Sequence, residues 1–152
     1  MNHPPQSITS RLSRVVPVAL LLVASATVHA QQPMPLSLTG AAEVPPVTTS
    51  ATGAGNITVL PDRTVSGNIK TSGLVPTMAH IHQAAAGENG PVIITLTKTS
   101  DDSFAVPADA KLSKAQYTSY VAGNLYVNVH SAQYPNGEIR AQLLGKPITL
   151  AH

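Results

Sequence analysis

The feature that most constrains the fold is a series of short segments in which apolar and polar residues alternate, separated by clusters of Gly, Pro, Asn and Ser. Alternation puts every second side chain on one face of a β-strand, and the intervening residues are typical of turns. Seven strands are predicted, at residues 36–39, 56–60, 64–71, 78–82, 91–96, 124–130 and 138–144. We therefore expect an all-β protein with an antiparallel Greek-key sandwich.

One short helix is predicted between the last strands. Ser113 and Gln116 have the spacing of a capping box, in which each side chain satisfies a backbone amide at the helix start. Gly123 stands where helices often end in a left-handed residue. The helix should run from about Lys114 to Ala122. Seven strands with one helix favour an immunoglobulin-like or superoxide-dismutase-like sandwich.

Residues 1–30 have the three parts of a secretory signal peptide. Arg11 and Arg14 supply positive charge, an apolar run covers residues 15–24, and small residues precede a cleavage position after Ala30. The run is shorter than the roughly 20 residues that span a bilayer. We expect removal of this segment and an extracytoplasmic location, periplasmic or secreted.

Residues 31–152 are then expected to form a single domain. The whole chain carries nine Lys and Arg against seven Asp and Glu, and loss of the two signal arginines leaves seven of each. A neutral chain has no basic surface for nucleic acid or anionic membrane, so both partners are excluded after cleavage. Aromatic residues are only 3%, so Val, Ile, Leu and Ala must fill the core, and the absence of Cys restricts any metal site to nitrogen and oxygen ligands.

The histidines are the residues most informative about function. The chain has six; two lie in the predicted signal peptide and one is the C-terminal residue. The other three, His80, His82 and His130, all fall on predicted strands.

Strand alternation places these three histidines on one side of the sheet. His80 and His82 share the face opposite Ala79 and Ile81. On the later strand, the residues facing away from the core are Tyr126, Asn128 and His130. We expect the imidazoles to meet on the outer surface of a sheet, or at a rim covered by loops.

A His-x-His pair on a strand spaces its side chains by roughly 6–7 Å, a gap that two imidazoles can close onto one ion. A third His from a nearby strand gives a three-nitrogen set with an open position, suited to copper or zinc. We place copper ahead of zinc. The alternative is that His80, His82 and His130 are hydrogen-bonded or solvent-facing residues without a metal.

The predicted strand at residues 138–144 carries further polar residues that should lie near the three histidines. Antiparallel pairing should bring Glu138 near His130 and Arg140 near Asn128. A carboxylate there could orient the imidazole from behind. Equally, Glu138 and Arg140 could form an ordinary solvated pair of little energetic value.

Glu43 allows two interpretations. It precedes Val44 and the double proline at residues 45–46, and proline cannot join a ladder, so the segment is a bent end of the first strand. Alternatively, the Glu43 carboxylate lies near the metal.

Three ordered motifs resemble the chordin-type (CHRD) domain family. They are residues 38–47, residues 79–82 with 87–92, and residues 122–130 continued by 134–140. The resemblance spans about residues 36–145. It implies an extracellular domain, since such domains occur in animals within chordin, an antagonist of signalling ligands. Bacterial members are mostly single-domain exported proteins.

A weaker similarity is to the copper site of copper–zinc superoxide dismutases. There too a His-x-His strand precedes a late strand ending in His, and the resemblance implies that His80, His82 and His130 are copper ligands. The chain departs from that family because residues 83–91 lack a bridging His, no His and Asp cluster matches the zinc site, and there is no Cys. Only a copper site carries over.

Three functions stay open at this point. The first is an exported protein that binds a transition metal, most readily copper, through three histidines on the sheet surface. The second is a non-catalytic extracellular interaction module without metal, and the third is a copper-only dismutase-like enzyme. A protein partner or a homo-oligomer is compatible with each.

Overall fold

The computed structural model describes Met1 and residues 35–145. The predicted signal peptide therefore lies, apart from Met1, outside the described residues, and its cleavage stays a prediction.

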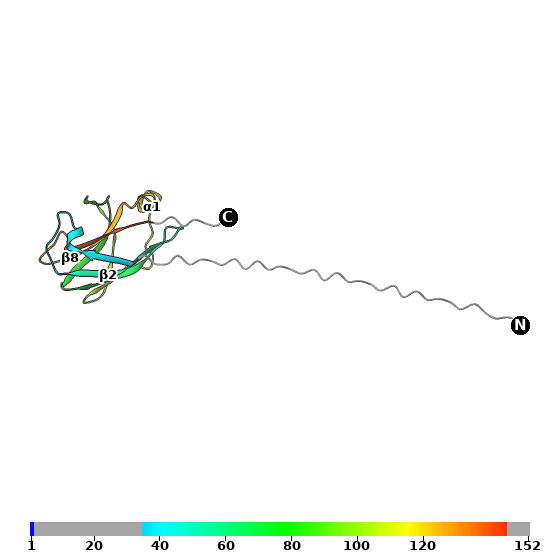
Figure 1. The fold of residues 1–152 in the computed structure, drawn as a ribbon, viewed down its shortest axis with the longest axis horizontal. Coiled ribbons are helices and arrows are strands. Elements are labelled where there is room, and N and C mark those ends of the chain that lie inside the picture. The colour runs from blue at the N-terminus through cyan, green and yellow to red at the C-terminus, as the bar shows by residue number, and fades with distance from the viewer. Residues whose placement is uncertain (2–34, 146–152) are drawn as a thin grey trace. The chain divides into compact units, whose positions relative to one another are not determined.

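The described residues form nine strands, a short 3-10 turn and one helix (Figure 1). In chain order these are β1 (Pro35–Thr39), η1 (Gly40–Ala42), β2 (Thr52–Val59), β3 (Val65–Ser72), β4 (Pro76–Gln83), β5 (Val92–Thr95), β6 (Thr97–Ser100), β7 (Ser103–Ala105), α1 (Lys114–Val121), β8 (Leu125–Ser131) and β9 (Ile139–Leu143).

All nine strands belong to one antiparallel sheet with the order β5-β4-β8-β9-β1-β2-β3-β7-β6. Its two outermost strands, β5 and β6, are consecutive in the chain and are separated by Leu96 alone. The Leu96 amide donates to the carbonyl of Ala79 on β4. The sheet therefore bends back on itself into a nearly closed, barrel-like sandwich, which confirms the predicted all-β class.

The structure has two more strands than were predicted, because β6 and β7 show no clear alternation of apolar and polar residues. All four residues of β6 are exposed, and β7 has only three residues. The start of β2 was also missed, since residues 52–55 are mostly small and carry no apolar pattern. Gly55 is required there because a side chain would collide with the Asn68 backbone of the neighbouring strand.

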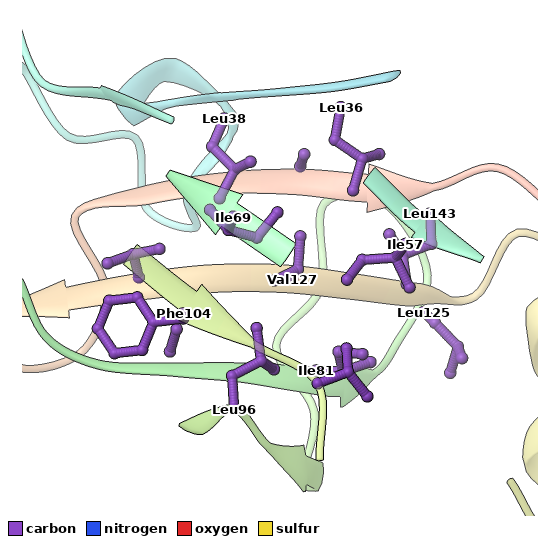
Figure 2. Close-up of a cluster of buried hydrophobic side chains, with 14 of the residues drawn as sticks. Leu36, Leu38, Ile57, Ile69, Ile81, Leu96, Phe104, Leu125, Val127 and Leu143 are labelled. Carbon is purple, nitrogen blue, oxygen red and sulfur yellow. The ribbon is translucent and has the colours of Figure 1, made fainter. Parts of the chain in front are cut away.

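The core is built almost wholly from aliphatic side chains, as the low aromatic content predicted (Figure 2). Leu38, Ile69 and Val127 come from three different strands and are completely shielded from solvent. Each buried side chain of this size contributes roughly 1.5–3 kcal/mol of hydrophobic free energy. The core thus anchors β4, β8 and β9, whose opposite faces carry the three histidines and the polar residues around them.

The helix prediction is confirmed to within one residue. The Ser113 hydroxyl accepts from the Gln116 amide at 3.1 Å, and the Gln116 side chain accepts from the Ser113 amide at 2.8 Å. Gly123 has φ +77°, as a left-handed helix end requires. The chain then enters β8 directly.

Among the described residues, no helix combines the length and the apolar character needed to cross a membrane.

Candidate metal centre

Three adjacent strands, β4, β8 and β9, carry the candidate ligands His80, His82 and His130 and the polar side chains around them. Their core-facing residues include Ile81, Val127 and Ile139, which are at most 1% exposed. The opposite face of β8 is covered as well, because all seven residues of this strand are buried. Loops at residues 84–90 and 132–138, together with the segment after η1, lie against it.

The three predicted histidines converge on this covered face. One nitrogen from each of His80, His82 and His130 lies within 4.8 Å of the others. His82 and His130 are 8% and 6% exposed, whereas His80 is half-buried. Of the two expected arrangements, the structure has the loop-covered one, and the cluster does not lie on an open sheet surface.

Backbone carbonyls from two different loops orient two of the rings. Nδ1 of His82 lies 2.9 Å from the carbonyl oxygen of Gly90, and Nδ1 of His130 lies 2.9 Å from that of Pro135. Because a carbonyl can only accept, each Nδ1 holds the proton. Nε2 of the neutral His130 ring therefore carries its free lone pair, the form that binds a metal. Nε2 of His82 instead faces a second acceptor, Oδ1 of Asn128.

The His80 ring points Nδ1, rather than Nε2, toward the other histidines. Nδ1 of His80 lies 2.9 Å from Nε2 of His130. Since Nδ1 of His130 already donates to Pro135, Nε2 accepts and His80 donates. The inward-facing nitrogens are thus Nδ1 of His80 and Nε2 of His130, whereas Nε2 of His82 contacts the side chain of Asn128.

Electrostatics keep two of the rings neutral. Burial, followed by the neighbouring His130 and His82, lowers the pKa of His80 to about 4. Burial also lowers the pKa of His130, although its bond to Pro135 opposes this. At neutral pH both rings are neutral imidazoles with a single N–H, so neither carries a positive charge that would oppose an ion.

The spacing fits one ion after a small adjustment. Bonds of about 2.0–2.1 Å to one centre put ligand nitrogens roughly 3–4 Å apart. The cluster spans up to 4.8 Å, so its widest pair must close by about 1 Å. Oδ1 of Asn128 lies 3.0 Å from Nε2 of His82, and because an amide oxygen can only accept, both nitrogens of this ring face acceptors. This amide would have to move aside.

Tyr126 supports His82 from the neighbouring strand. The two rings are stacked, with centroids 4.7 Å apart and planes 3° apart. The guanidinium carbon of Arg140 lies 3.4 Å from the centroid of the Tyr126 ring. Strand order puts β8 between β4 and β9, so the phenol ring is held between the imidazole and the cation.

Arg140 also fixes the loop that orients His82. The guanidinium donates to the carbonyls of Ala85 and Glu88 and to the side chain of Asn89. These residues lie in the same loop as Gly90, whose carbonyl accepts from His82. Arg140 thus acts on the imidazole through the loop.

The expectation of a solvated Glu138–Arg140 pair is wrong. Glu138 is 5% exposed and Arg140 1% exposed. The Glu138 carboxylate accepts from the hydroxyls of Ser131 at 2.5 Å and Thr49 at 2.8 Å. The register does pair Asn128 with Arg140, but Glu138 does not orient His130, whose Nδ1 bonds Pro135.

Glu43 has the structural role that was expected of it, and its place near a metal stays a prediction. It ends the turn after β1, and its carboxylate is buried behind Asn128, one residue removed from His82. Burial raises its pKa, whereas Arg140 and Asn128 act in the opposite direction. Its Oε1 has no hydrogen-bond partner within the part of the chain that the structure describes.

The orienting groups missing from the sequence prediction are backbone carbonyls. Those of Gly90 and Pro135 have no side-chain signature, because every residue carries a carbonyl. The turn compositions around them predicted loops but not their hydrogen-bond partners.

The family model of the CHRD domain matches residues 34–143. The chain belongs to the CHRD domain family. The match covers all nine strands of the structure and all three histidines of the cluster. Comparisons of this CHRD domain with curated proteins and with solved structures find no match.

Proposed function

We propose that this CHRD domain binds a transition metal, copper in preference to zinc, through Nδ1 of His80, Nε2 of His82 and Nε2 of His130. One observation carries the proposal: the rings of His82 and His130 each donate their remote N–H to a backbone carbonyl. Histidines that bind metals almost always make such a bond, which fixes the tautomer and the ring direction. Two rings are held this way within one cluster.

Copper is favoured by the ligand chemistry. The donor set is three imidazoles with no thiolate, which suits copper and zinc among the common metals. For equal ligands, divalent copper binds more tightly than zinc. The half-buried His80 leaves one side of the cluster nearest to solvent, where a further ligand can enter.

The location belongs to the same proposal. The predicted signal peptide supports export, and membership of the CHRD family agrees with an extracellular setting. Outside the cytoplasm, the function would be copper sequestration or delivery.

The first test is calorimetric titration of the purified, tag-free protein with Cu(II) and with Zn(II), repeated on His82→Ala. We expect one copper ion per chain, tighter than zinc, and loss of at least about 100-fold in affinity in the variant. Ser113→Ala is the matched control, because it alters the helix cap and leaves the cluster intact. Unchanged copper affinity in a His80→Ala, His130→Ala double variant would contradict the assignment.

A non-catalytic interaction module is the second candidate, favoured by family membership itself. In that case the three rings and their loops serve only to build the surface. The absence of saturable binding of Cu(II), Zn(II) and Cu(I) to the wild-type protein would leave this candidate in place.

Dismutase-like turnover of superoxide is the third candidate and depends on the first. It needs copper at the cluster together with a position open to a small anion. A superoxide assay on copper-loaded protein, with His82→Ala as the inactive reference, decides between turnover and binding alone.

A further inference from the structure

Met78 lies on the same face of β4 as the two histidines of that strand. Side chains alternate between faces, and the intervening Ala79 is fully buried in the core. The direct cross-strand partner of Met78 is His130. Met78 therefore has one cluster histidine opposite it on β8 and another, His80, two residues further along its own strand.

The distances implied by this register are short. Directly opposed residues in antiparallel strands have Cβ atoms about 4.5–5.5 Å apart. Residues i and i+2 of one strand are roughly 6–7 Å apart. The methionine side chain has three rotatable bonds and adapts readily to its surroundings. Its thioether can therefore reach a metal held between His80 and His130.

Exposure places Met78 at the solvent end of the cluster. Its side chain is 47% exposed, His80 is half-buried, and His82 and His130 lie beneath the loops. An ion entering from solvent would meet the sulfur and His80 first. Packing does not account for this position, because about half of the side chain remains in contact with water.

We propose that Met78 is a fourth, sulfur ligand of the cluster and that it makes the site a binding site for Cu(I) as well as Cu(II). The inference rests on the proposed function, since it requires copper at the three histidines. Thioether sulfur is a soft donor that selects Cu(I), whereas imidazole serves both oxidation states. A site of three imidazoles and one thioether can hold copper in either state, as a delivery protein requires.

The test is the Cu(I) affinity of the purified protein, measured without oxygen by competition with a chromophoric Cu(I) chelator, beside the Cu(II) affinity. Met78→Leu removes the sulfur and keeps the size and apolar character. We expect Cu(I) binding to weaken at least about tenfold and Cu(II) binding to change less than about twofold. Val75→Leu, another exposed apolar position near the start of β4, is the matched control and should leave both affinities unchanged.

X-ray absorption of the Cu(I)-loaded protein supplies an independent readout. A sulfur scatterer should be present in the wild type and in Val75→Leu, and should be lost in Met78→Leu. Unchanged Cu(I) affinity in Met78→Leu, with no sulfur scatterer in the wild type, overturns the role of Met78. If His82→Ala still loses copper in that case, the three-histidine site stands without Met78. A wild-type protein that binds neither ion overturns the proposed function itself.

Discussion

Nδ1 of His80 lies 2.9 Å from Nε2 of His130, so two candidate ligand atoms contact each other directly in the protein. Because Nδ1 of His130 donates to Pro135, the contact is a hydrogen bond donated by His80. The bond holds the rings together without a metal. An ion would replace its proton and bind two atoms that already face each other, whereas Nε2 of His82 must first leave its contact with Asn128.

The metal-free protein should lose stability through His80 as the pH falls. The folded-state pKa of about 4 lies below the ordinary value of 6.5, so between these values the unfolded chain binds more protons. The His80 contribution to the free energy of unfolding is therefore unimpaired above about pH 6.5 and declines toward pH 4. Urea denaturation at several pH values, comparing wild type with His80→Gln, isolates this effect. The raised pKa of Glu43 acts with the opposite sign and is common to both proteins. A stability difference between the two proteins that does not vary with pH would contradict the assignment.

Replacement of Arg140 by Met should weaken copper binding without touching a ligand. The variant leaves the acceptors of the loop at residues 84–90 unsatisfied, which costs at least about 2 kcal/mol of stability. The Gly90 carbonyl would then no longer hold His82 in place, and loss of such an orienting contact typically costs 10–100-fold in affinity. Lys70→Met is the matched control, since its ion pair with Asp102 is exposed to solvent and lies outside the site. Equal copper affinities in wild type and Arg140→Met would show that the loop does not orient the ring.

Gly137→Ala should displace Glu43 and Asn128, of which Asn128 contacts His82. A Cβ atom at Gly137 would lie 2.5 Å from Oε1 of Glu43 and 2.7 Å from Nδ2 of Asn128. The backbone φ of +127° adds strain of about 1–3 kcal/mol. Gly123→Ala also has positive φ but no neighbouring atom within 4 Å, so it measures strain alone. Calorimetry should show weaker copper binding in Gly137→Ala only, and this variant should also have the larger fall in melting temperature. Similar behaviour of both variants would argue against a link from Asn128 to the three histidines.

Ser113→Ala should separate global stability from binding. The change removes the hydroxyl that accepts from the Gln116 amide and costs about 1 kcal/mol of stability. The cluster makes no contact with this cap, so copper affinity should equal that of wild type. A reduced affinity would mean that losses in the other variants reflect stability rather than ligand geometry.

Much of the site followed from local chain geometry. Side-chain alternation has a period of two residues wherever a strand forms, so His80 and His82 had to share a face opposite Ala79 and Ile81. Simple hairpin pairing likewise placed Arg140 opposite Asn128, and the structure has that register. The capping box of α1 was predicted for the same reason, since its bonds link residues three apart.

Segments with weak local signals were missed. Strand β6 is exposed at every position and β7 is three residues long, so neither carries alternation. Both form because β3 offers a free edge to β7, and β7 in turn pairs with β6. Such pairing depends on residues far along the chain.

The sequence by itself determined that the three imidazoles would face away from the core, because alternation is a property of the backbone. The pairing of β4 with β8, which brings His130 to the other two histidines, was decided by the tertiary structure. Only the tertiary structure decided which nitrogen of each ring faces the others and how deeply the rings are buried. Those properties depend on the carbonyls of Gly90 and Pro135 and on the loops that carry them. Arg140 holds the first of these loops across about 50 residues of sequence, and no local pattern specifies a contact of that range.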